Sequence, residues 1–129
     1  MPRSIDIFAE SEVSLEDFVK DIEKLLEIKL QRISDGEEIV YEFRDPRVVF
    51  TVGTHDLAND RDMNFEDYRY HLSARALNIS TEEERKKWRG EFARVIFQKL
   101  RTTQNYHLML VEDIQVKLAE FHPEADIVR

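Results

Sequence analysis

Apolar residues recur at two spacings along the chain, and the first of these predicts a helix over residues 15–26. Leu15, Phe18 and Ile22 lie three or four positions apart, as they would on one face of a helix. Ser14 precedes them as a hydroxyl N-cap, and acidic residues follow in the first turn, where the positive end of the helix dipole favours them. Most of the remaining positions are charged. The segment is therefore predicted to be an amphipathic helix.

A second helix is predicted to open at Ser80 or Thr81 and to run to about Thr102. Three glutamates follow the opening residues, again at the positive end of the helix. Apolar residues at three- and four-residue spacing predict a buried stripe of Trp88, Phe92, Val95, Ile96 and Leu100. This helix is also expected to pack one face on a core and to leave the other in water.

The second spacing is an alternation of apolar and polar residues, which predicts strands. The first predicted strand precedes the first helix, and three follow that helix in succession. Two more enclose the second helix, so that the predicted strands span residues 3–9, 30–33, 39–44, 48–53, 69–77 and 106–111. Residues 114–118 fit either a continuation of the last strand after a bend or a short helix, and the pattern does not decide between them.

The order of these elements predicts an α+β fold. We expect an antiparallel sheet of about five to six strands with two amphipathic helices packed on one face. A doubly wound sheet would need a helix between most strands, and residues 30–77 show no convincing helical spacing. At 129 residues the chain has the size of one domain, so residues 1–129 are expected to share a single core, with residues 122–129 as a frayed tail.

Composition limits the chemistry that the chain can perform. There is no cysteine for disulfides, thiol chemistry or metal binding, and the three isolated glycines cannot build a phosphate-binding loop. The four histidines lack the paired spacing of a helical metal site. We therefore predict no metal site and no cofactor, and assign no catalytic residue. Because the chain has neither a signal-like start nor an apolar run of about 18 residues, we expect a cytoplasmic protein that makes no use of a membrane.

Residues 54–68 form a long connection without an apolar period, and negative charge is concentrated there. The whole chain has 27 acidic residues against 19 Lys and Arg, a net charge of -8. Within the connection Arg61 alone opposes five acids, which are Asp56, Asp60, Asp62, Glu66 and Asp67. Such a cluster repels nucleic-acid phosphates and attracts a basic protein. A connection this long is uncommon in a compact domain unless it is functional or mobile.

Our first hypothesis is a non-enzymatic domain that binds a basic protein partner. Its contact surface would combine the five acids with Tyr68, Tyr70 and Arg75, because tyrosine and arginine are enriched among the residues that dominate interface energies. Small cytosolic immunity proteins that neutralise basic toxins have this general size and charge, although the chain carries no motif of such a family. The plainer interpretation is that the acids only keep the connection hydrated.

The alternative hypothesis is a small-molecule or acid–base site on the wet face of the sheet. Its candidate residues are His55, Asp56, His71 and Arg75. These side chains must converge, because acid–base partners act within hydrogen-bond reach or through one water, and a separation of His55 from His71 beyond about 10 Å would exclude the site. A third interpretation is a homo-oligomer subunit that has no separate ligand.

Overall fold

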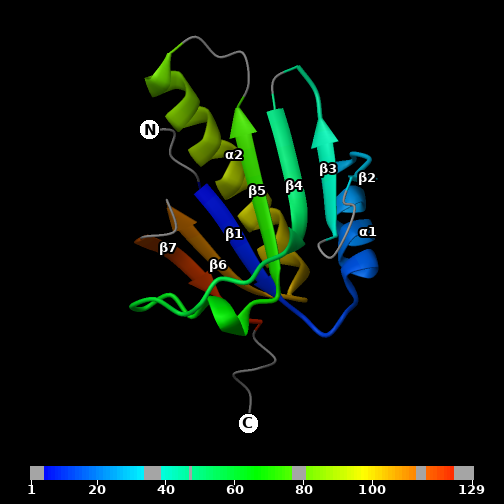
Figure 1. Ribbon diagram of the computed structural model, residues 1–129, viewed down its shortest axis with the longest axis vertical. Coiled ribbons are helices and arrows are strands. Elements are labelled where there is room, and N and C mark those ends of the chain that lie inside the picture. The colour runs from blue at the N-terminus through cyan, green and yellow to red at the C-terminus, as the bar shows by residue number, and fades with distance from the viewer. Residues whose placement is uncertain (1–4, 34–38, 47, 77–80, 113–115, 124–129) are drawn as a thin grey trace.

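The computed structural model describes residues 5–33, 39–46, 48–76, 81–112 and 116–123, in which one antiparallel sheet carries both helices on a single face (Figure 1). In chain order the elements are β1 (Ile5–Glu10), α1 (Leu15–Leu26), β2 (Gln31–Arg32), β3 (Val40–Arg44), β4 (Val48–Thr54), η1 (Phe65–Asp67), β5 (Tyr70–Ala76), α2 (Glu82–Thr103), β6 (His107–Glu112) and β7 (Val116–Phe121). The predicted α+β class is confirmed. The sheet has seven strands instead of five to six, because residues 116–118 of the segment that the pattern left undecided belong to the strand β7.

The strands are ordered β2-β3-β4-β5-β1-β6-β7 across the sheet, so the first strand of the chain lies near its centre. Strand register shows which residues share a face. Asp6 is opposite Ser73, Ser73 is opposite Thr51, and Thr51 is opposite Glu42. These four residues form a polar row across the face that the helices leave uncovered.

Both helices begin where a hydroxyl group can cap them. The Oγ of Ser14 accepts a hydrogen bond from the backbone N–H of Asp17, as the sequence predicts for α1. Thr81 caps α2 by accepting from the N–H of Glu84, which decides between the two predicted openings. The two helices and the sheet enclose the main core, whose buried members include Ile7, Phe18, Phe50, Leu72 and Leu110.

The predicted stripe on α2 is buried only in part. Val95 is 53% exposed, so the prediction for this residue was wrong. The buried face of the helix is centred on Ala93, Ile96, Phe97 and Leu100. At about 100° of rotation per residue, Val95 lies well over a quarter-turn away from the centre of that face. By spacing alone Val95 belongs to the same stripe as Ile96 and Leu100. Only the position of the sheet shows that those two residues are buried and Val95 is exposed.

A second, smaller core lies on the opposite face of the sheet from the helices. It joins Phe8, Met109 and Val111 of the central strands to Met63, Phe65 and Tyr68 of the connection between β4 and β5. The connection is therefore packed onto the sheet, and Figure 1 shows it crossing the end of the strands. We call residues 55–69 the acidic loop.

Two predictions concern the chain ends and membranes. Of the predicted frayed tail, Pro123 is buried and His122 is exposed, and residues 124–129 lie outside the described residues. Within the segments that the structure describes, no helix has both the length and the apolar character needed to cross a membrane.

Candidate functional site: an acidic loop beside the polar sheet face

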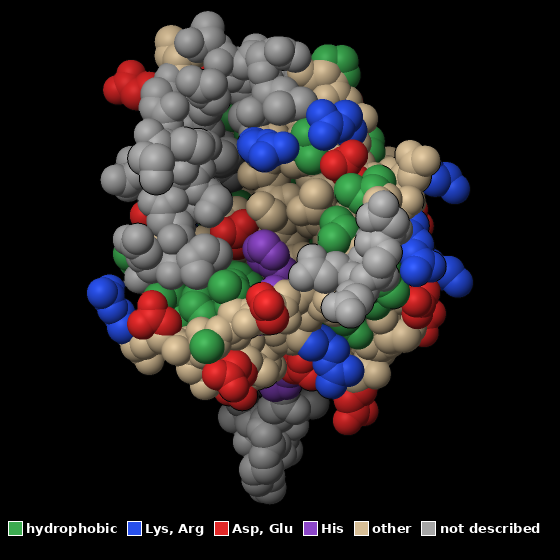
Figure 2. Space-filling view, viewed as in Figure 1, with side chains coloured by type: hydrophobic (Ala, Val, Ile, Leu, Met, Phe, Trp, Pro, Cys, Tyr) green, Lys and Arg blue, Asp and Glu red, His purple; other side chains and the backbone are tan. Residues whose placement is uncertain are grey.

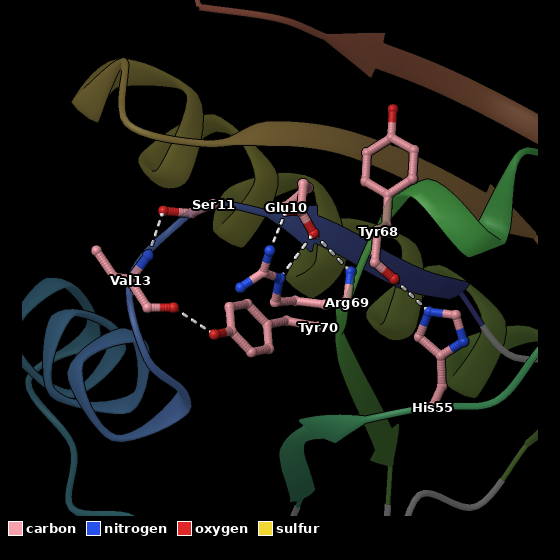
Figure 3. Close-up of polar contacts among 7 residues, drawn as sticks. All are labelled: Glu10, Ser11, Val13, His55, Tyr68, Arg69 and Tyr70. Carbon is pink, nitrogen blue, oxygen red and sulfur yellow. Dashed lines mark hydrogen bonds and ion pairs between the residues drawn. The ribbon is translucent and has the colours of Figure 1, made fainter.

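His55 connects the two ends of the acidic loop. Its Nδ1 accepts a hydrogen bond from the backbone N–H of Leu57 at 3.0 Å, and its Nε2 donates to the backbone carbonyl of Tyr68 at 2.5 Å (Figure 3). Because Nδ1 accepts, the proton sits on Nε2 and the ring is neutral. Burial lowers the pKa of His55 and nearby His71 lowers it further, whereas the bond to Tyr68 and the charge of Asp56 act in the opposite direction.

Further hydrogen bonds give the middle of the loop a defined shape. The backbone N–H of Asn59 donates to Glu66 Oε2 at 3.0 Å, and the N–H of Glu66 donates back to Asn59 Oδ1 at 2.9 Å. Asp60 and Met63 exchange two backbone hydrogen bonds around a turn. With Met63 and Phe65 buried beneath it, the loop holds its acidic residues at fixed positions.

All five acids of the loop are exposed, namely Asp56, Asp60, Asp62, Glu66 and Asp67. Within the described part of the chain, no Lys, Arg or His side chain forms an ion pair with any of them. The neighbouring Arg69 is instead paired with Glu10, with Nη2 2.9 Å from Oε2 (Figure 3). Figure 2 shows acidic side chains along the edge of the sheet face where the loop lies. Among the described residues, the negative charge of the loop is therefore not neutralised by ion pairs.

Two of the predicted contact residues, Tyr68 and Tyr70, are not on the surface. Tyr70 is buried in the main core, where it stacks on Phe18 and its hydroxyl donates to the carbonyl of Val13 (Figure 3). Tyr68 belongs to the second core, and burial raises the pKa of its hydroxyl, with the nearby carboxylate of Glu120 adding to the effect. Neither side chain presents contact area to a partner, because each faces one of the two cores.

The structure brings together a carboxylate and an imidazole that sequence reasoning did not pair. Asp6 on β1 is only 2% exposed, and its Oδ1 lies 3.3 Å from Nε2 of His71 on β5. The side chain of His71 is 27% exposed although its Nε2 is shielded, so the accessible part of the ring faces away from Asp6. The available signal was a charged residue between Ile5 and Ile7 in a predicted strand.

The predicted pocket residues converge only in part. The ring centroids of His55 and His71 are 6.2 Å apart, within the stated limit, and Phe8 contacts both rings. However, both nitrogens of His55 are bonded to backbone groups. Asp56 is exposed on the loop, and Arg75 is exposed four residues from His71 along β5, about 13 Å in an extended strand. Of the four predicted residues only His55 and His71 therefore lie close together, and Asp6 is the carboxylate that lies beside His71.

The other two histidines meet at the far edge of the sheet. Nδ1 of His107 lies 2.7 Å from Nδ1 of His122, whose Nε2 lies 2.8 Å from Glu120 Oε2. The hydrogen bond from Lys117 is the main reason why the pKa of Glu120 is lowered, and the one from His122 contributes. Among the described residues, no three side chains of the metal-binding types are grouped closely enough to hold a metal ion.

Comparison with known proteins finds no matching family model, no similar curated protein and no similar solved structure.

Proposed function

We propose that the protein is a binding domain that captures a basic protein partner through the acidic loop. The observation that carries the proposal is a set of five exposed carboxylates on an ordered loop, with no ion-pair partner in the described chain. Uncompensated carboxylates attract a cationic surface and accelerate its encounter. An ordered loop also loses little conformational entropy on binding. Immunity-type neutralisation of a basic toxin in the cytoplasm is one form of this function.

The sheet face beside the loop supports the same proposal. Glu42, Thr51 and Ser73 of the polar row are partly exposed on this face, and Arg75 is exposed on the same side of β5. The helices cover only the opposite face. A partner docked on the loop therefore reaches hydrogen-bonding groups on the sheet as well as the carboxylates.

A fluorescent oligolysine peptide is a suitable probe for the loop. Its affinity should be measured by fluorescence anisotropy at low and high salt, for the wild type and for the double variant Asp60→Asn/Asp62→Asn. Because each exposed charge contributes up to about 1 kcal/mol at low salt, the variant should bind about tenfold more weakly. High salt should weaken the wild-type complex by screening.

A control with the same change in net charge distinguishes the loop from the acidity of the whole protein. Glu16→Gln/Glu91→Gln removes two exposed carboxylates from the helices on the other side of the sheet. Its affinity should stay within about twofold of the wild type, because those groups lie on the helices, on the opposite face of the sheet from the loop, and salt screens exposed charges over about 10 Å. Equal losses in both double variants, or binding that high salt leaves unchanged, would contradict the proposal.

The pair formed by Asp6 and His71 favours a second candidate function, small-molecule binding or acid–base chemistry on the polar sheet face. A buried carboxylate whose oxygen lies 3.3 Å from an imidazole nitrogen can hold the ring in one orientation, as a binding site or an acid–base site requires. A fragment library screened by ligand-observed NMR against the wild type and His71→Gln tests this candidate. Fragments that bind the wild type but not the variant would support it. Binding that the substitution leaves unchanged, or no binding at all, would contradict it.

A further inference from the structure

A pocket of about 340 Å³ opens on the helix side of the sheet. It lies between the C-terminal end of α1, the strands β3 and β4, and one flank of α2. Its apolar walls include Leu26, Ile28, Phe43, Trp88, Phe92 and Val95. The acidic loop packs on the other face of the sheet, so the pocket is separate from the proposed partner-binding surface.

The packing of α2 explains why an apolar hollow remains here. The face of α2 that meets the sheet is centred on Ala93, Ile96, Phe97 and Leu100. Trp88 and Phe92 therefore lie on the flank of that face, only partly buried. On the other side α1 ends at Leu26, and the following residue is in the left-handed conformation that terminates the helix. The chain leaves the helix layer at this point, and the flank of α2 stays open.

The chemistry of the walls is apolar and partly aromatic. The rings of Trp88 and Phe92 are stacked, with centroids 4.9 Å apart and planes inclined by 16°. An edge-to-face contact with Phe50 holds Phe92 in place. Among the described residues, the charged one on the lining is Asp45, and its carboxylate accepts a hydrogen bond from the N–H of Val48 at 2.9 Å. The pocket thus presents a fixed aromatic wall, and its described lining does not require a charged ligand.

The surroundings of the pocket favour a small molecule over a protein. Among the described residues the exposed large hydrophobic side chains are Ile33, Val95 and Val116, and of these only Val95 borders the pocket. The nearby helix surface is charged, with Glu91 and Arg94 exposed. A stable protein interface buries about 800 Å² on each partner around an apolar centre, which this rim does not provide. A concavity of 340 Å³ falls at the lower end of the range of about 300 to 1,000 Å³ for ligand pockets.

We propose that this pocket binds a small, uncharged, apolar molecule, with an aromatic ring or a short alkyl chain lying against Trp88 and Phe92. Such a ligand replaces water on aromatic surface that the fold leaves exposed. The proposal does not depend on the acidic loop, so either can fail without the other.

The fluorescent dye N-phenylnaphthylamine, which is neutral and apolar, is the first probe. We expect one dye molecule to bind each chain, with an increase in fluorescence. Val95→Glu should weaken binding at least about tenfold, because it sets a carboxylate beside the apolar ligand. Val116→Glu is the matched control, since Val116 is 51% exposed but lies on β7, outside the pocket. It should change the affinity by less than about twofold.

Octanol provides a second measurement that needs no variant. It should displace the dye from the wild type, and it should shift the emission of Trp88, the only tryptophan of the chain, to shorter wavelength as water leaves the ring. If Val95→Glu fails to fold, which far-UV circular dichroism would reveal, the shift of the Trp88 emission by octanol tests the proposal without the variant. No dye binding, equal binding by both valine variants, or no octanol effect would overturn the proposal. So would gel filtration showing a wild-type dimer that Val95→Glu dissociates, because a second copy would then occupy the pocket.

Discussion

The imidazole of His55 donates a hydrogen bond to the backbone carbonyl of Tyr68, and this contact closes a loop between two residues that are thirteen positions apart in sequence. Its other nitrogen accepts from Leu57 near the start of the loop. The neutral side chain of His55 therefore connects backbone groups near the two ends of the loop, where no strand pairing connects them. The acidic residues are presented from a closed loop instead of from a free chain.

His55→Ala should destabilise the loop. Two hydrogen bonds are lost, and the Tyr68 carbonyl is left without its side-chain donor. The loss should lower the free energy of opening the loop by about 1 to 3 kcal/mol. Amide hydrogen exchange at Leu57 should accelerate accordingly. The matched control is His122→Ala, which removes an exposed histidine at the edge of the sheet and should leave this amide unchanged. Equal exchange in the wild type and His55→Ala would show that the imidazole does not hold the loop.

Stability should fall on the acid side of neutrality, and His55 should account for part of the loss. Burial lowers the folded-state pKa of His55 below the ordinary value of 6.5, so the unfolded chain binds more protons between the two values. The free energy of unfolding therefore rises with pH across this window. The stabilising effect is complete above 6.5 and is lost as the pH falls below it. Urea unfolding at several pH values should show a shallower pH dependence for His55→Gln, and an identical dependence would contradict this role.

Phe65→Ala should weaken partner binding without changing any charge. Phe65 is buried in the second core and its ring packs on Phe8, with centroids 4.9 Å apart. Truncation should destabilise the loop by about 3 kcal/mol, the lower end of the cost for a core phenylalanine. Oligolysine affinity should then fall several-fold, because the carboxylates lose their fixed arrangement. The control is Phe92→Ala on the helix side, which should leave oligolysine binding unchanged. An unchanged affinity in Phe65→Ala would mean that the order of the loop is irrelevant to binding.

Tyr106→Phe should destabilise the helix layer. The hydroxyl of Tyr106, just before β6, donates to the carboxylate of Asp21 on α1. Burial is the main reason why the pKa of this hydroxyl is raised, and the carboxylate of Asp21 adds to the effect. Removing the donor leaves a partly buried charge without this bond, at a cost of about 1 to 3 kcal/mol. A double-mutant cycle with Asp21→Asn, followed by urea unfolding, measures the coupling. Additive effects of the two substitutions would show that the pair contributes no interaction energy.

Periodicity was sufficient to predict most elements because both spacings are local properties of the backbone. Ser14 and the apolar residues after it specify α1 within a few turns, and the alternation around Ile5 and Ile7 specifies β1. The same reasoning erred at Val95, because a helical period shows that residues share a flank but not which way the sheet lies. The alternation in β5 does set Tyr70 on one face with Leu72, but it gave no sign that Tyr68 would be buried on the opposite face of the sheet.

From its residues alone the chain determined its α+β class, its helix caps and the concentration of acids in one connection, because these depend on neighbours in sequence. Only the tertiary structure decided that β1 lies between β5 and β6, and hence that Asp6 meets His71 and that Phe8 receives the acidic loop. Strand order sets these partners. It results from the burial of apolar surface across the whole sheet, which no short stretch of sequence records.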